Sequence, residues 1–245
     1  MKIALCFSGH LRTYKSVLGS WRCQFIDVYN PDVFVHTWDV AGLYIPPVFA
    51  MLPSEHKGTV EITNTPIDLE YVYSTLQPKE CIVESYSKHE AEFIRRCSNW
   101  IEWRDTFAPN ASITNCHPHP MLSQLYKLWA VTKLTKVYNY DIIICARPDL
   151  LLDDPFPVEY LNPEYFWVNK CDDAGVYIDD IIKAGSPINI YRYANLYHEL
   201  DILFEKAQSE NRPFDFFSIH SIQYLHCRRN EIPLVAHPFP GHLLR

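Results

Sequence analysis

The chain has 245 residues, 48% of them hydrophobic, and a formal net charge of −7 at pH 7, because 29 acidic side chains outnumber 22 basic ones. This size and composition predict one globular domain, and the charge argues against a nucleic-acid partner, which requires a basic face for its phosphates. The apolar run at the N-terminus is too short for a signal peptide, and no segment has the roughly 18 consecutive apolar residues of a membrane helix. We therefore expect a cytoplasmic protein with no membrane span.

The N-terminal segment predicts alternating strands and helices. Residues 3–7 are apolar and favour a strand, which Ser8 and Gly9 end, and apolar side chains then recur at helical spacing over 17–28. Residues 32–36 predict a second buried strand. This strand–helix–strand order is typical of a parallel sheet with right-handed crossovers.

Turn residues and apolar spacing predict the elements that follow. Residues 40–65 are rich in proline and predict a long loop, after which Thr65 and Pro66 predict the start of a helix that runs to residue 76. Further helices are predicted at 89–107, 121–138, 187–208 and 216–229, and further strands at 81–83, 140–146 and 165–168. A loop is predicted at 110–120, where Pro118 and Pro120 argue against regular helix.

The most continuous aliphatic run lies at 140–146, and such a run suits a central strand buried on both faces. The eight cysteines are scattered, and no two of them have CxxC spacing. They favour reduced thiols in a reducing compartment over a disulfide framework or a structural zinc site.

Three polar clusters follow the predicted strands of the sheet. In open α/β sheets, ligands bind beyond the carboxyl ends of the strands, so we expect these clusters to converge on one site. They comprise Ser8, Gly9, His10 and Arg12 after the first strand, His36, Thr37, Trp38 and Asp39 after the second, and Arg147 and Asp149 after the central one.

Arg147 and Asp149 are two residues apart, so their side chains leave the same face if the strand geometry continues. A carboxylate at this place is able to ligate a divalent cation, which neutralises a diphosphate as it becomes a leaving group. The alternative is an ion pair between Asp149 and Arg147 that closes the end of the strand.

Several segments together carry a resemblance to a known group of proteins. The segments IALCFSGHLRTYK, VFVHTWD, SQLYKLWAVTKL with YDIIICARPDLLL, and DDIIKAGSP occur in this order from the N-terminus to about residue 200. In order and spacing they resemble glycosyltransferase-like proteins of the GT-A fold from large DNA viruses and bacteria, where such proteins build capsid or surface glycans.

The resemblance implies a single Rossmann-like GT-A domain over residues 1–245, with a mostly parallel central sheet flanked by helices. Its nucleotide-binding half would cover about 1–150 and its acceptor-side half about 151–245. For a viral protein, the implied location is the host cytoplasm. The donor nucleotide sugar would contact Ser8, Gly9, His10, Arg12, Thr37, Trp38, Asp39, Arg147 and Asp149.

The resemblance also implies a metal site and a catalytic base. The GT-A DxD motif binds Mn²⁺ or Mg²⁺, and Arg147-Pro148-Asp149 stands at its place with only the second aspartate present, so Arg147 is an alternative counter-charge for the diphosphate. Asp180 aligns with the carboxylate that deprotonates the acceptor, with Asp179 in reserve; a helix N-terminus is the alternative there. His237 and His242 are further candidate metal ligands, or incidental residues of a proline-rich tail.

We therefore expect a glycosyltransferase that moves a sugar from a nucleotide-sugar donor, a UDP-sugar in the first instance, to a hydroxyl of a glycan acceptor with inversion. A nucleotidyltransferase is a second reading, although the loop at 8–12 is poor in the glycine and lysine that such enzymes use. A third reading is a non-catalytic domain of the same fold that binds carbohydrate or nucleotide.

Overall fold

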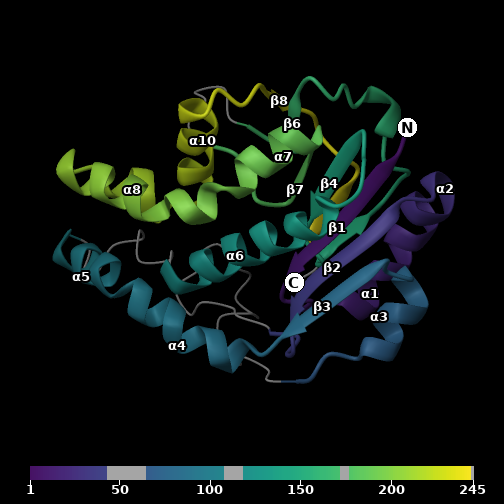
Figure 1. Cartoon of the computed structure of the whole chain (residues 1–245), viewed down its shortest axis with the longest axis horizontal. Coiled ribbons are helices and arrows are strands. Elements are labelled where there is room, and N and C mark those ends of the chain that lie inside the picture. The colour runs from purple at the N-terminus through teal and green to yellow at the C-terminus, as the bar shows by residue number, and fades with distance from the viewer. Residues whose placement is uncertain (43–64, 108–117, 172–176, 244–245) are drawn as a thin grey trace, which may run out of the picture.

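The computed structural model describes residues 1–42, 65–107, 118–171 and 177–243. Most of the loops predicted at 40–65 and 110–120 therefore lies outside the described residues. In the described part, a central sheet has helices packed on both of its faces (Figure 1). This arrangement confirms the predicted α/β class and is compatible with a Rossmann-like fold.

The main sheet is mostly parallel, as predicted. Its strands are β1 (Ile3–Gly9), β2 (Asp32–Trp38), β3 (Glu80–Glu84), β4 (Ile142–Ala146), β6 (Phe166–Val168), β7 (Ile182–Gly185) and β8 (Leu234–Ala236). They lie in the order β3-β2-β1-β4-β7-β6-β8. β1 pairs in parallel with β2 and β4, whereas β7 is antiparallel to both of its neighbours, β4 and β6. Strands from both predicted halves of the chain thus share one sheet.

The two central strands are buried on both faces because their sequences are continuously apolar. All five residues of β4 are buried, as is the start of β1. Leu5 and Ile144 pack into a core on one face, whereas Cys6 and Cys145 pack into a core on the other. The prediction of a central strand at 140–146 is confirmed.

The helices form layers on either side of this sheet (Figure 1). One face is covered by α1 (Tyr14–Trp21), a π-helical turn at Arg22–Ile26, α2 (Asp27–Tyr29) and α3 (Leu69–Leu76). The other face is covered by α6 (Pro118–Thr135), α7 (Pro187–Ala194) and α10 (Ile219–Arg229). Beyond this second layer lie α4 (Tyr86–Arg96), α5 (Ser98–Phe107), α8 (Leu196–Ser209) and α9 (Pro213–Phe217).

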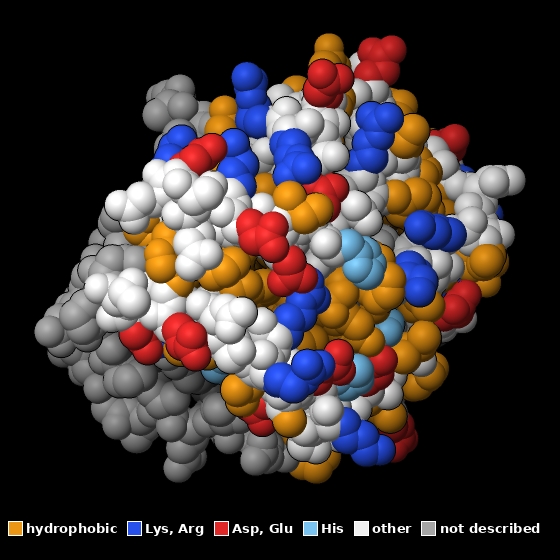
Figure 2. Space-filling model, turned by 60° about the vertical axis from the view of Figure 1, so that its left-hand side comes forward, with side chains coloured by type: hydrophobic (Ala, Val, Ile, Leu, Met, Phe, Trp, Pro, Cys, Tyr) orange, Lys and Arg blue, Asp and Glu red, His pale blue; other side chains and the backbone are white. Residues whose placement is uncertain are grey.

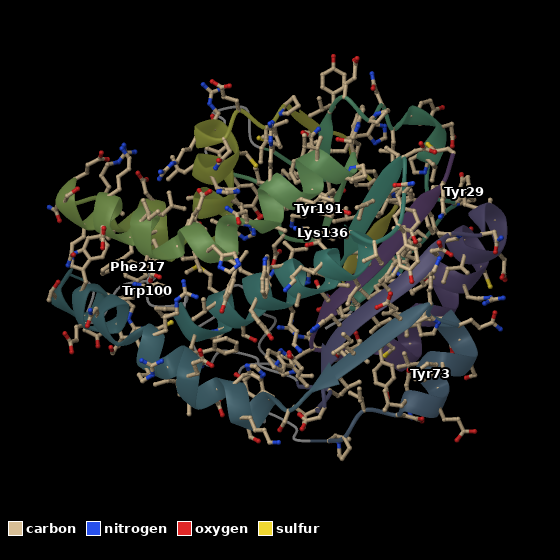
Figure 3. All side chains as sticks on the ribbon, in the orientation of Figure 1. Tyr29, Tyr73, Trp100, Lys136, Tyr191 and Phe217 are labelled. Atoms are coloured by element: carbon tan, nitrogen blue, oxygen red, sulfur yellow. The ribbon has the colours of Figure 1, made fainter. Side chains whose placement is uncertain are left out.

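A third core holds these outer helices together. Trp100 of α5 packs against Phe216 of α9 and Phe204 of α8, with ring centroids 5.0 and 5.9 Å apart. Figure 3 shows Trp100 and Phe217 on this side of the molecule, away from the sheet. The aromatic side chains therefore stabilise a helical extension of the sheet domain.

Two predicted helix starts are wrong. α3 begins at Leu69, because Asp68 caps it by accepting a hydrogen bond from the backbone N–H of Tyr71 at 3.0 Å. Thr65 and Pro66 precede this cap, and Pro66 forms a β-bridge with Val40. α6 begins at Pro118, inside the predicted loop, because a proline in the first turn has no intrahelical hydrogen bond to lose.

Three predicted helices are each divided in two. The segment 89–107 divides at Cys97, the segment 187–208 divides at Asn195, and the segment 216–229 divides at Ser218. At the last of these, the backbone of Ser218 is extended and its hydroxyl accepts a hydrogen bond from the N–H of Ser221. Apolar spacing continued across each break, and so it did not reveal them.

A small second sheet was not predicted. It pairs β5 (Leu150–Leu152) with β9 (Gly241–Leu243) in antiparallel fashion.

Among the described residues, no helix has both the length and the apolar character that crossing a bilayer requires. On the face drawn in Figure 2, acidic and basic side chains are interspersed around areas of hydrophobic side chains.

Candidate functional site

The carboxyl ends of β1, β2 and β4 lie at one edge of the sheet because these strands are parallel. β7 runs in the opposite direction, so its amino end lies at the same edge. This reversal brings Asp180, which precedes β7, to the side chain of Arg147, which follows β4. The geometry therefore joins two segments that the sequence leaves 33 residues apart.

A pocket that is open to solvent lies at this edge of the sheet. Ligands of open α/β proteins bind in clefts at this place. Its lining includes the predicted residues Ser8, Gly9, His10, Arg12, Trp38, Arg147, Asp149 and Asp180. The predicted convergence of the strand-end clusters on one cavity is thus observed for most of their members.

Arg147 is the centre of the charged network in this pocket. Its Nε and Nη2 donate to the two carboxylate oxygens of Asp149 at 2.9 and 2.7 Å. Its Nη1 donates to Oδ2 of Asp180 at 2.7 Å. A second guanidinium, that of Arg12, lies 3.3 Å from Asp149, and Gln124 of α6 donates to Asp180 at 3.0 Å.

Burial and charge act against each other on these groups. Burial would raise the pKa of Asp149, but the hydrogen bonds and charge of Arg147 outweigh it and hold the pKa below its usual value. Burial likewise opposes the charge of Arg147 at Asp180, whose pKa is held well below its usual value. Burial would lower the pKa of Arg147, yet the charges of Asp180 and Asp149 raise it. All three groups are therefore ionised at neutral pH.

The end of β1 and the loop that follows it place Gly9 and Arg12 in the pocket wall. Gly9 has φ +100°, a backbone conformation that residues other than glycine rarely adopt. Arg12 also has positive φ, at 47°, and its N–H donates to the carbonyl of Ala41 at 2.8 Å. The chain turns sharply here, and the turn directs the guanidinium of Arg12 back toward Asp149.

An aromatic wall faces these charges. The His10 ring lies 4.8 Å from the Tyr86 ring and 6.1 Å from the Trp38 ring. Burial lowers the pKa of His10 to about 4, so its imidazole is neutral at neutral pH. Lys127 lies 3.5 Å from the centre of the Trp38 ring and donates to Glu84 at 2.8 Å, which fixes α6 to the sheet edge.

Two residues of the predicted donor site lie outside the pocket lining. Thr37 donates its hydroxyl hydrogen to the carbonyl of Gly9 at 2.8 Å. Asp39 accepts a hydrogen bond from the N–H of Tyr86 at 2.9 Å. Both side chains thus hold neighbouring loops in place around the pocket.

Asp179 also points away from the pocket lining. It is buried and accepts a hydrogen bond from Asn169 at 2.7 Å, while burial raises its pKa. Asp180 precedes a strand, so the helix N-terminus considered for this segment is wrong.

The two candidate histidine ligands lie outside the pocket lining as well. His237 packs against the rings of Tyr160 and Phe239, with centroids 6.0 and 5.7 Å away, and His242 contacts Asp153 at 3.0 Å. Asp149 already has both carboxylate oxygens occupied by Arg147. No group of three or more His, Cys, Asp or Glu able to hold a metal ion occurs in the described part of the chain. These residues, as arranged, do not fit a Mn²⁺ or Mg²⁺ ion.

Sequence reasoning missed several polar residues of the lining. They are Ser123 and Gln124 of α6, Lys183 of β7, Tyr193 of α7 and Gln223 of α10. Lys183 carried a signal, since a lysine within the apolar run 181–184 of a buried strand requires an explanation. The helical residues carried none, because single polar side chains on amphipathic helices are common.

Neither a model of a known protein family nor a curated protein matches this chain. The case for a function therefore depends on the geometry of the pocket.

Proposed function

We propose that this chain is a glycosyltransferase of the GT-A type, which transfers a sugar from a nucleotide-sugar donor to a hydroxyl group of a glycan. The observation that carries the proposal is the pairing of Arg147 with Asp149 and Asp180 beside Arg12, in a pocket at the carboxyl edge of a mostly parallel sheet. Nucleotide ligands bind at such edges in other open α/β sheets.

The two arginines would bind the diphosphate of the donor. A guanidinium matches phosphate with two parallel hydrogen bonds, and it also stabilises the negative charge that develops as the diphosphate departs. Arg147 and Arg12 are both at the pocket wall, 2.7 and 3.3 Å from the same oxygen of Asp149. A phosphate would therefore compete with Asp149 for both side chains.

Asp180 would act as the base in an inverting reaction. The acceptor oxygen bonds to the anomeric carbon while the bond from that carbon to the phosphate oxygen breaks, the electron pair leaves with the diphosphate, and the acceptor proton moves to Asp180. Arg147 holds the pKa of Asp180 low, which makes the resting carboxylate a weak base. When the diphosphate draws Arg147 away, that pKa rises, so donor binding would activate the base.

The arginine pair makes the metal predicted from the resemblance dispensable in this scheme. Mn²⁺ or Mg²⁺ would need carboxylate oxygens that Arg147 occupies here. We expect nucleotide binding to survive EDTA for this reason. Seven cysteines of the described residues are free thiols, which suits the reducing compartment that we propose for this chain, such as the cytoplasm.

Thermal-shift titration with UDP, GDP and their sugar conjugates, with Mn²⁺ or with EDTA, tests the proposal. We expect stabilisation by one nucleotide series and hydrolysis or transfer of its sugar. Asp180→Asn should abolish transfer while nucleotide binding remains. Asp153→Asn is the matched control, because the Asp153 side chain is exposed and pairs with His242 outside the pocket lining. Absence of stabilisation by any nucleotide would refute the proposal, and full transfer by Asp180→Asn would refute the assignment of Asp180 as the base.

One observation favours a binding domain as the second candidate. Arg147 forms ion pairs with both carboxylates of the pocket, Asp149 and Asp180. Such pairing would suit a site that binds a ligand without catalysing a reaction. Nucleotide-sugar binding without hydrolysis or transfer across a panel of acceptors would select this candidate.

A further inference from the structure

The inner wall of the pocket carries polar groups that the proposed chemistry does not use. Lys183 of β7, Tyr193 of α7 and Gln223 of α10 all line the pocket. Their exposed fractions are 4, 1 and 1%. Three elements of the fold thus each contribute one deeply buried polar side chain to the same surface.

These side chains have unused hydrogen-bonding capacity. The hydroxyl of Tyr193 and the Oε1 atom of Gln223 are buried and have no hydrogen-bond partner among the described residues. The Nζ atom of Lys183 lies 5.9 Å from the centre of the Tyr193 ring. Burial lowers the pKa of Lys183, while the charges of Asp180 and Asp179 oppose that effect.

Unpartnered polar groups in an apolar core cost free energy, so their placement in a pocket wall calls for a ligand that satisfies them. Phe166 packs on Tyr193 with ring centroids 4.7 Å apart, which restrains the position of the phenol ring. A polar group held in this way favours selective recognition.

The mixture of donors and acceptors identifies the class of ligand. An ammonium donates, an amide oxygen accepts, and a phenol does both. A sugar ring matches this set because each hydroxyl group both donates and accepts. A phosphate offers only acceptors, and here it would face the Gln223 oxygen and the carboxylate of Asp180.

We infer that Lys183, Tyr193 and Gln223 form a hydroxyl-binding subsite for the sugar ring of the donor, an assignment that rests on the proposed function. Asp180 is close to both parts of the pocket, since it accepts hydrogen bonds from Arg147 and Gln124 and its charge acts on Lys183 and Tyr193. The nucleotide diphosphate would occupy the arginine side of the pocket and the sugar the inner side.

Paired titrations test the subsite separately from the nucleotide site. Isothermal titration calorimetry compares UDP with UDP-glucose, UDP-galactose and UDP-N-acetylglucosamine, and GDP with GDP-mannose. For the series that binds, we expect the wild type to prefer a sugar conjugate to the bare diphosphate. Tyr193→Phe, which removes one hydroxyl, should weaken binding of that conjugate about threefold to tenfold and leave binding of the bare diphosphate unchanged.

Lys183→Met should weaken binding of the conjugate more strongly, by about tenfold to a hundredfold. Unchanged binding of the bare diphosphate shows that this variant is folded. Tyr191→Phe is the matched control on the same helix: its hydroxyl contacts Thr135 at 3.0 Å, and Figure 3 shows Tyr191 beside Lys136. It should change neither affinity.

Each result decides a different point. If the wild type binds conjugates no better than the bare diphosphate, or if Tyr193→Phe weakens both equally, the sugar subsite is wrong while the nucleotide site stands. If the wild type binds no nucleotide at all, the proposed function fails and the subsite with it.

Discussion

Removal of the Arg147 side-chain charge tests the central network most directly. Arg147→Met keeps an unbranched side chain and leaves Asp149, whose side chain is 2% exposed, and Asp180, whose side chain is 13% exposed, without their main partner. Breaking a buried pair by removing one partner costs about 3–5 kcal/mol, because the remaining charge stays buried. Arg12 at 3.3 Å compensates Asp149 in part, so we expect the lower end of this range.

The sign of the pH dependence is a second part of the same prediction. In the wild type, the lowered pKa values of Asp149 and Asp180 contribute stability above the usual aspartate pKa of about 3.9, and this stability is lost as the pH falls through the native values. In Arg147→Met, burial without a counter-charge raises both pKa values. The destabilisation should therefore be largest at neutral pH and shrink toward pH 4.

Urea unfolding and thermal unfolding at pH 7 and pH 4.5 measure both effects. For a chain of about this size, 1 kcal/mol shifts Tm by about 2–4 °C, so we expect a loss of about 6–12 °C at pH 7. Arg212→Met is the control, because the Arg212 side chain is 60% exposed and pairs with Asp215 near the surface, where such pairs contribute about 1 kcal/mol or less. A loss for Arg147→Met no larger than that of the control, or one that grows toward pH 4.5, would refute the reasoning.

Two further predictions concern stability alone. Burial and the charge of Lys127 lower the pKa of His36 to about 4, so the folded state loses stability as pH falls from about 6.5 to about 4. His36→Gln should remove this loss, which amounts to at most about 1.4 kcal/mol in the free energy of unfolding per pH unit. Denaturation midpoints across this pH window test the prediction, and an unchanged pH dependence would contradict the assigned cause. A Cβ at Gly241 would clash with the carbonyl oxygen of Leu151, whereas one at Gly19 meets nothing within 4 Å. Gly241→Ala should therefore lower the free energy of unfolding by about 1–3 kcal/mol and Gly19→Ala should raise it by about 0.5–1 kcal/mol, and equal urea midpoints would count against this packing.

The parts of the fold that local patterns specify were predicted correctly. The aliphatic run at 140–146 is long enough to require burial on both faces, and this alone placed β4 at the centre of the sheet. The rule that parallel strands end at one edge then brought Ser8, Arg12 and Arg147 to a single pocket.

The parts that depend on pairing between distant segments were missed. The direction of β7 is set by its neighbours β4 and β6, and neither alternation nor composition within 182–185 records it. The pairing of β5 with β9 joins residues about ninety positions apart, and its registry places Gly241 against Leu152. Helix breaks were missed for a related reason, since a cap such as Ser218 acts through its backbone conformation while the apolar spacing continues.

The sequence left two roles open for Asp149, a metal ligand and an ion pair with Arg147, and the structure contains the ion pair. A lone aspartate after a central strand suggests a metal ligand, but its nearest cations are the guanidinium groups of Arg147 and Arg12. An anionic ligand that binds these two guanidinium groups must therefore displace the carboxylate of Asp149. Under the proposed function, the affinity for a diphosphate would depend on the difference between two ion pairs, and Asp180 would be released only while the ligand is bound. Such a pocket would couple occupancy by an anion to the basicity of a neighbouring carboxylate.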